Sequence, residues 1–170
     1  MGIVKTLNGS TPTLGKDCFI AETAVLIGSV DMGDYCSIWY NAVLRGDVNW
    51  IRLGNKVNVQ DNATIHCTYK KAATEVGNNV SIGHNAIVHG CTIHDNVLVG
   101  MGSVIMDKCV IGSGSIIAAG AVLTQGTVVP EGSIFAGVPA RKIGEVGPEL
   151  REGEIQRIAE AYITYSSWYK

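Results

Sequence analysis

Aromatic residues are scarce in this sequence. They make up 6% of its 170 residues, with two phenylalanines and three tryptophans, so the core of the fold must be built mainly from aliphatic side chains. The hydrophobic share of 46% is enough for one such core, and a chain of this length leaves no room for a second catalytic domain. The 21 glycines indicate a backbone that turns often, which favours stacked turns over a helical bundle.

A large excess of charge and a long apolar run are also missing. Thirteen basic and fifteen acidic residues give a formal charge of -2. Because Lys and Arg form no cluster that could neutralise a run of phosphates, we expect no nucleic-acid partner. No apolar run reaches the length of a membrane span, and the segment MGIVKTLNGS contains no signal-peptide core. We therefore expect a cytoplasmic protein without a membrane partner.

The five cysteines are an odd number, which does not suit a disulfide framework. Cys18, Cys36 and Cys109 share one small-residue position of the repeat described next, so we expect them to be buried as small apolar side chains. This use of cysteine is typical of a reducing cytosol.

An aliphatic residue recurs at every sixth position over most of the chain. The regular runs cover residues 14–44, 53–65, 76–88 and 93–135, and the register breaks near residues 50–52 and 70–75. A six-residue period fits neither an α-helix nor a single strand, so each hexad must be a short strand followed by a corner. Three hexads close one coil of about eighteen residues, and parallel coils stack about 4.8 Å apart.

The repeat predicts an all-β fold, a parallel β-helix over residues 1–147. Glycines that follow the aliphatic residue are expected to adopt unusual backbone dihedrals: Gly77, Gly83, Gly100 and Gly112. After Pro148, an apolar set shares one helical face: Ile155, Ile158, Ala159, Tyr162 and Ser166. This pattern predicts a helix within residues 148–170 that packs on the β-helix or on a neighbouring subunit.

All four histidines lie in the central coils. His66 and His84 are eighteen residues apart, about one coil, while His84 and His89 are five apart and span a corner. His66 follows its aliphatic residue by one position and His84 by two, so the two side chains need not point the same way. Three imidazoles with one open position form a frequent catalytic zinc site. The spacing alone leaves open whether these three are ligands or unrelated surface histidines, and we expect His94 to be structural or solvent-facing.

A second polar group lies nearby in the repeat. Arg45 and Asp47 occur in LRGD, and Asn58, Gln60 and Asp61 occur in VNVQDNATIH. An arginine with two carboxylates can form a fixed ion-pair network, and an amide such as that of Gln60 can orient a water or a small substrate. The same residue types are also ordinary at corners, so the composition allows a purely structural role.

Three segments in this order resemble the γ-class carbonic anhydrase family: SIWYNAVLRGD at 37–47, NVQDNATIH at 58–66 and VSIGHNAIVHG at 80–90. The resemblance extends over essentially the whole chain. It implies a single-stranded left-handed parallel β-helix that assembles as a homotrimer with a divalent metal at each subunit interface. His66 and His89 of one chain and His84 of its neighbour would hold the metal. Zinc is the metal we expect, although imidazoles also bind iron(II) and cobalt.

The activity that this resemblance implies is the reversible hydration of carbon dioxide to bicarbonate by metal-bound hydroxide. Arg45, Asp47 and Asp61 would then belong to the network that fixes the subunit interface. Gln60, with Asn58 nearby, would hydrogen-bond the bound water or substrate. Tyr162 matches a family position from which a tyrosine reaches the site from outside the β-helix.

The sequence departs from the family pattern where protons are transferred. Some members carry glutamates at places that Val48 and Tyr69 occupy here, and the loop of this chain contains only Glu75. The resemblance therefore implies a slow or inactive enzyme unless another group takes the proton.

Two other functions remain open on the sequence. The segment FAGVPAR at 135–141 resembles the end of hexapeptide-repeat acyltransferases, which use a histidine as general base, so an acyltransferase or thioesterase is one alternative. The other is a non-catalytic trimeric scaffold in which the metal only stabilises the assembly.

Overall fold

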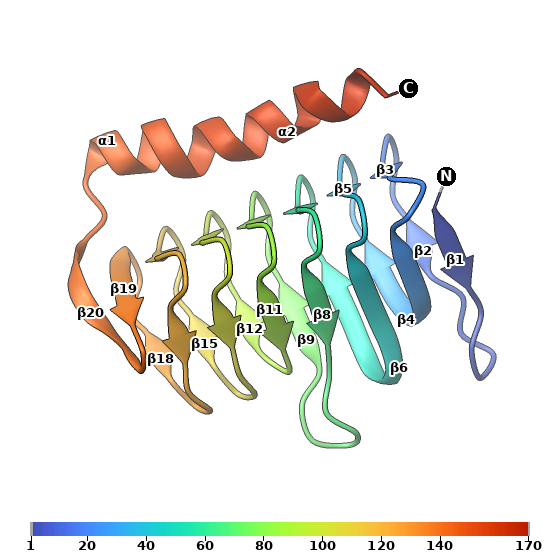
Figure 1. Cartoon of the computed structure of the whole chain (residues 1–170), viewed down its shortest axis with the longest axis horizontal. Helices are drawn as coiled ribbons and strands as arrows, with labels where there is room; N and C mark the ends of the chain where they lie inside the picture. Colours follow the sequence, from blue (N-terminus) through green and yellow to red (C-terminus); the bar gives the residue numbers. More distant parts are fainter. Residues whose placement is uncertain (1, 170) are drawn as a thin grey trace.

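The chain forms a β-helix of about seven coils with one helical segment along its side, as Figure 1 shows for the computed structural model, which describes residues 2–169. The coil is left-handed and its strands pair in parallel, so the predicted fold class is confirmed. Each coil adds one short strand to each of three faces, so the molecule is a three-sided prism. Two long strands turn a corner and belong to two faces at once.

We number the faces in the order in which the chain visits them after its first strand. Face 1 contains β1 (Ile3–Lys5), the first halves of β4 (Val25–Met32) and β6 (Val43–Leu53), β8 (Thr64–His66), β11 (Ile87–His89), β14 (Val104–Ile105) and β17 (Val122–Leu123). Face 2 contains β2 (Thr13–Leu14), the second halves of β4 and β6, β9 (Thr74–Val76), β12 (Thr92–Ile93), β15 (Val110–Ile111) and β18 (Val128–Val129). Face 3 contains β3 (Phe19–Ile20), β5 (Ser37–Ile38), β7 (Asn58–Val59), β10 (Ser81–Ile82), β13 (Leu98–Val99), β16 (Ile116–Ile117), β19 (Ser133–Gly137) and the antiparallel β20 (Ala140–Glu145).

The core is a set of aliphatic ladders that run the length of the prism. On face 1 the inward residues pair from coil to coil and are fully buried: Leu26, Leu44, Ile65, Val88, Ile105 and Leu123. Burial of each such side chain contributes roughly 1.5–3 kcal/mol, and the parallel hydrogen bonds hold the coils in register. The six-residue periodicity is therefore the periodicity of the core.

The glycines that follow the aliphatic residue have a different role from the one expected. Gly77, Gly83, Gly100 and Gly112 are not among the residues with positive φ, so the expectation of unusual dihedrals is wrong for all four. A Cβ at Gly100 would lie 2.5 Å from the backbone nitrogen of Ala119 in the next coil. These positions need glycine because adjacent coils approach too closely for a side chain.

Both breaks of the sequence register fall on the edge between faces 1 and 2, which we call the 1–2 edge. In β6, residues 47–50 stand opposite Ser29 alone, because Gly46 pairs with Gly28 and Ile51 with Val30. One coil later, residues 67–73 form a loop between β8 and β9 that protrudes below this edge in Figure 1. Extra chain has therefore been added twice at the same edge of an otherwise regular prism.

The C-terminal segment is one continuous helix that lies along face 3 (Figure 1). It consists of α1 (Pro148–Leu150), a π-helical stretch (Arg151–Gln156) and α2 (Arg157–Ser167). The predicted apolar face is the one that packs on the prism, since Ile155, Ala159 and Ser166 are buried and the ring of Tyr162 contacts Trp39 with centroids 5.2 Å apart. The helix thus covers the prism of its own chain.

Two further properties of the chain concern its cysteines and its helices. All five cysteines are free, and four of them are buried, while Cys18 is half-buried. None of the helices in the described part of the chain is long and apolar enough to cross a membrane.

Candidate metal centre

Two of the three predicted metal ligands meet on the 1–2 edge. His66 ends β8 and His89 ends β11, and the two residues are direct partners in the parallel pairing of these strands. The Nδ1 atom of His66 lies 3.1 Å from the Nε2 atom of His89. The expected spacing of one coil between His66 and His84 is wrong, because the 67–73 loop lengthens this coil and brings His89 to that place instead.

The imidazole of His66 is held on its other side by Asp47. His66 Nε2 lies 3.0 Å from Asp47 Oδ1, and Arg45 Nη1 donates to Asp47 Oδ2 at 2.5 Å. Burial raises the pKa of the Asp47 carboxyl, but the hydrogen bonds from Arg45 and His66 outweigh burial and hold that pKa below its ordinary value. Asp47 is therefore an ionised acceptor at neutral pH.

His89 is held in a corresponding way by a residue that the sequence interpretation missed. His89 Nδ1 lies 2.5 Å from Asp107 Oδ1, and the hydroxyl of Thr68 donates to Asp107 Oδ2 at 2.5 Å. Burial raises the pKa of the Asp107 carboxyl, but the hydrogen bonds from Thr68 and His89 outweigh burial and hold that pKa below its ordinary value. The available signal in the sequence was the separation of eighteen residues, one coil, between His89 and Asp107.

These hydrogen bonds fix which nitrogens are free to bind a cation. An ionised carboxylate only accepts, so the network assigns a proton to Nε2 of His66 and to Nδ1 of His89. The remaining nitrogens, Nδ1 of His66 and Nε2 of His89, then carry lone pairs and lie 3.1 Å apart. Only a proton or a cation between them relieves the repulsion of these lone pairs. Two tetrahedral zinc ligands at 2.0–2.1 Å would be separated by about 3.3 Å. The pair therefore fits two positions of a divalent-cation site.

The third predicted ligand lies elsewhere on the chain. His84 stands on the edge between faces 3 and 1, which we call the 3–1 edge, with Nδ1 2.9 Å from Asp61 Oδ2. Its Nε2 atom lies 3.5 Å from the hydroxyl of Tyr162 on α2. Within residues 2–169, no group of three or more His, Cys, Asp or Glu side chains is arranged to hold a metal. One chain thus carries a pair of imidazoles on one edge and a single imidazole on another.

The remaining predicted residues gather around His84 and not around the pair. Gln60 Nε2 donates to Asn58 Oδ1 at 3.0 Å, and Asn58 Nδ2 donates to Ser81 Oγ at 2.7 Å, with both amides buried. Burial, followed by the charge of Asp61, raises the pKa of Tyr162 to about 12, so its hydroxyl keeps its proton at neutral pH. His94 is exposed after β12 and takes no part in either group.

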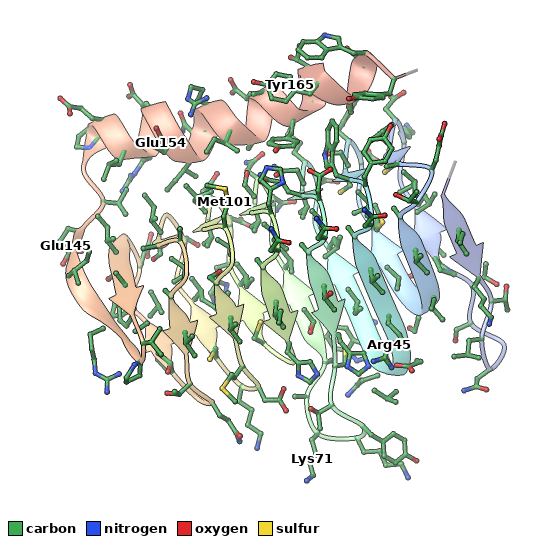
Figure 2. All side chains as sticks on the ribbon, viewed as in Figure 1. Arg45, Lys71, Met101, Glu145, Glu154 and Tyr165 are labelled. Carbon is green, nitrogen blue, oxygen red and sulfur yellow. The ribbon has the colours of Figure 1, made fainter. Side chains whose placement is uncertain are left out.

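A cavity of about 420 Å³ runs between the helix and face 3, beginning at Gln60, His84 and Tyr162. The helix contributes the charged side chains of Glu154 and Arg157 to its wall. The rest of the wall is mainly aliphatic: Leu98, Val99, Ile116, Ile117, Ile158 and Ala161. Figure 2 shows Met101 of the prism below the helix that bears Glu154 and Tyr165, while Arg45 lies at the opposite, lower edge. A mainly apolar cavity with a few polar groups in its wall is typical of a small-ligand site.

Face 1 separates the two groups and is apolar on its outside. Ile87, in the middle of this face, is 42% exposed. The outward residues of the face pair from coil to coil: Ile3, Val25, Val43, Thr64, Ile87, Val104 and Val122. His84 precedes this face and His89 ends it. An exposed apolar face between two incomplete polar groups is a feature of subunit interfaces.

Comparison with known proteins gives both a repeat family and named relatives. Residues 73–105 and 90–125 match the family model for the bacterial transferase hexapeptide (six repeats). The chain is 56% identical over 152 residues to "Probable carbonic anhydrase" of Methanocaldococcus jannaschii, covering 89% of this chain and 92% of that protein. It is 38% identical to "Gamma carbonic anhydrase 1, mitochondrial" of Arabidopsis thaliana, over 92% of this chain and 57% of that protein. Among solved structures, a hexapeptide transferase family protein from Anaplasma phagocytophilum superposes with a TM-score of 0.94 at 40% identity, covering 99% of this chain and 98% of that one.

Proposed function

This chain belongs to the γ-class carbonic anhydrase family, and from that premise we propose that it catalyses the reversible hydration of carbon dioxide to bicarbonate. The observation that carries the proposal is the His66–His89 pair, whose free nitrogens converge at 3.1 Å between two carboxylates. Two imidazole nitrogens that converge in this way, with each ring held on its other side by a carboxylate, suit a divalent cation and have no evident use in a purely structural corner.

We propose that the protein is a homotrimer in which His84 of one chain completes the site begun by His66 and His89 of its neighbour. The separation of the single imidazole from the pair by the apolar face 1 supports this arrangement. A rotation that brings the 3–1 edge of one chain to the 1–2 edge of the next repeats the same contact around a closed ring. In this assembly Arg45, Asp47 and Asp61 lie at the interface and position the ligands.

His66 and His89 of one chain and His84 of its neighbour would hold a divalent cation, which would supply a water nucleophile with a pKa lowered toward about 7. The residues around His84 orient the reactants. Asn58 fixes the amide of Gln60, which leaves the Gln60 carbonyl oxygen to accept a hydrogen bond from water. The protonated hydroxyl of Tyr162 donates to a bicarbonate oxygen, and the apolar wall of the cavity favours entry of uncharged carbon dioxide.

The residues at the two positions where some family members carry proton-accepting glutamates support a slow enzyme. Val48 and Tyr69, on the 1–2 edge beside the histidine pair, carry no carboxylate that could take a proton from the site. Proton departure would therefore limit turnover. We propose zinc as the cation, with iron(II) and cobalt as alternatives that imidazole also binds. The five free cysteines support a reducing cytoplasm as its location.

Metal analysis of anaerobically purified protein, combined with a carbon dioxide hydration assay, tests this function. We expect about one divalent cation per chain and measurable hydration, both of which His89→Ala removes. His94→Ala is the matched control, because His94 is exposed and follows β12 at the far end of face 2, and it should leave metal content and activity unchanged. A metal-replete trimer without hydration activity would contradict the enzyme and favour the non-catalytic scaffold.

A second candidate rests on the cavity beneath the helix. Its volume of about 420 Å³ lies in the range of small-molecule sites, and an aliphatic acyl group would bury more of its wall than carbon dioxide can. With His84 at one end as a general base, the cavity favours an acyltransferase or thioesterase as the alternative. Turnover of acyl-CoA thioesters by metal-free protein would establish it, and absence of both binding and turnover would remove it.

A further inference from the structure

Asp107 lies outside the three segments that resemble the family, yet its side chain contacts one of the predicted metal ligands. It lies one coil beyond His89 on the 1–2 edge, just after β14, and is half-buried. Its two carboxylate oxygens accept hydrogen bonds from two different side chains, Oδ1 from His89 Nδ1 and Oδ2 from Thr68 Oγ1, each at 2.5 Å. Three residues that lie far apart in the sequence are thereby linked in one chain of hydrogen bonds.

The surrounding backbone leaves room for this carboxylate. A Cβ at Gly90 would lie 2.5 Å from Asp107 Oδ1 and 2.9 Å from the Cβ of Ala72, so only glycine admits the carboxylate between the strand end and the loop. Thr68 comes from the 67–73 loop, the extra chain that breaks the repeat. The loop therefore both lengthens the coil that pairs His66 with His89 and delivers the hydroxyl that holds Asp107.

We propose that Asp107 is a positioning residue for His89: its carboxylate keeps the proton on Nδ1 and so directs the Nε2 lone pair at the cation, while Thr68 fixes the carboxylate. The inference rests on the proposed function for the identity of the cation site. It assigns to Asp107 on His89 the role that Asp47 plays on His66, although the two imidazoles use opposite nitrogens. Carboxylates behind metal-binding histidines commonly set the tautomer and ring orientation in this way.

An ordinary corner aspartate behaves differently in the same fold. Asp95 accepts the backbone N–H of Asn78 at 2.6 Å and so caps a corner of the prism. Both hydrogen bonds of Asp107 described above come from side chains, one of them a proposed ligand. Asp95→Ala is therefore a matched control that removes a corner carboxylate without touching the imidazoles.

The first test reads the tautomer of His89 in metal-free protein by ¹⁵N NMR with labelled histidine, under conditions where the ring is neutral. With only four histidines, single His→Gln variants assign the signals. We expect the Nδ1–H form in the wild type and a mixture of both tautomers in Asp107→Ala. A wild-type ring protonated on Nε2 would overturn the inference. This readout needs no bound metal, so it remains decisive if the wild type binds no cation and the proposed function fails.

The second test measures zinc affinity by competition with a chromophoric chelator. Loss of such a carboxylate typically weakens metal binding about 10–100-fold, and we expect a loss in that range for Asp107→Ala. Thr68→Val should weaken binding to a smaller extent, Thr68→Ser should preserve it, and Asp95→Ala should leave it unchanged. Thr68→Val keeps the test decisive if Asp107→Ala fails to fold. Wild-type affinity in Asp107→Ala, or in Thr68→Val where Asp107→Ala does not fold, would overturn the inference, as would equal losses in Asp107→Ala and Asp95→Ala.

Discussion

His66 and His89 meet nitrogen to nitrogen at 3.1 Å, although 23 residues separate them in a fold whose coils are built from hexads. The regular coil would place the residue eighteen positions after His66 at that point, and that residue is His84. The 67–73 loop changes which histidine becomes the neighbour. An irregularity of the repeat, and not the repeat itself, thus creates the pair on which the proposed function depends.

The space beside Asp107 gives the first prediction. Gly90→Ala forces a side chain against the Asp107 carboxylate at a position whose φ is +55°, whereas Gly102→Ala imposes the same strain at φ +66° with nothing within 4 Å. Both variants should lose about 1–2 kcal/mol of unfolding free energy from backbone strain, with a larger loss for Gly90→Ala. Only Gly90→Ala should also weaken zinc binding, measured by chelator competition. Equal zinc affinities in the two variants would show that the space beside Asp107 does not matter.

The core ladders give a prediction that is independent of the metal. Ile117 is fully buried between β13 and β19, so Ile117→Ala should reduce the free energy of unfolding by about 2–5 kcal/mol. Val128 is 65% exposed, and Val128→Ala should change the free energy of unfolding by less than about 0.5 kcal/mol. Urea unfolding of both variants at one protein concentration makes the comparison, because oligomer stability depends on concentration. A loss below about 1 kcal/mol for Ile117→Ala would contradict the assigned core.

The stacked thiols of the first two coils give a pH-dependent prediction. A hydrogen bond from the Cys36 side chain lowers the pKa of the Cys18 thiol to about 7, although burial raises it. The thiolate is the reactive form, so alkylation of Cys18 by iodoacetamide should speed up as the pH rises, with a midpoint near 7. Cys36→Ala removes this hydrogen bond and should move the midpoint above 7. Mass spectrometry of the Cys18 peptide measures the rate, and identical midpoints in both proteins would contradict the coupling.

The fold could be predicted from the sequence because one physical pattern repeats through it. A fully buried aliphatic residue at every sixth position leaves little alternative to stacked short strands, and the apolar face at Ile155 and Ala159 marks the helix that covers face 3. The role of the glycines after the aliphatic residue could not be predicted from the sequence. The close approach of adjacent coils depends on the stacking distance between backbones, which a periodicity in one chain does not reveal.

The candidate site could be predicted only in part. Residue types and motifs identified His66, His84 and His89, but their grouping depends on the length of one loop, which spacing does not determine. The sequence does not single out Asp107, because an aspartate at a corner is common and its role depends on a hydrogen bond between coils. The sequence predicts Gln60 and Asn58 near the metal site without saying which histidine they accompany. Within one chain, Gln60 lines the same cavity as His84 and is hydrogen-bonded to Asn58.

Each proposed cation site is shared between two chains, and complementation in mixed oligomers distinguishes such a site from one built within a single chain. His84→Ala chains keep the His66–His89 pair, and His89→Ala chains keep His84, so neither variant alone can form a complete site. When the two are co-expressed in equal amounts and all trimers, homotrimers included, are purified together, about a quarter of the interfaces combine an intact pair with an intact His84. We expect the mixture to regain about a quarter of the wild-type zinc content and hydration activity, while each variant alone has neither. A mixture as inactive and metal-free as its components, or full zinc content in His84→Ala alone, would contradict the shared site.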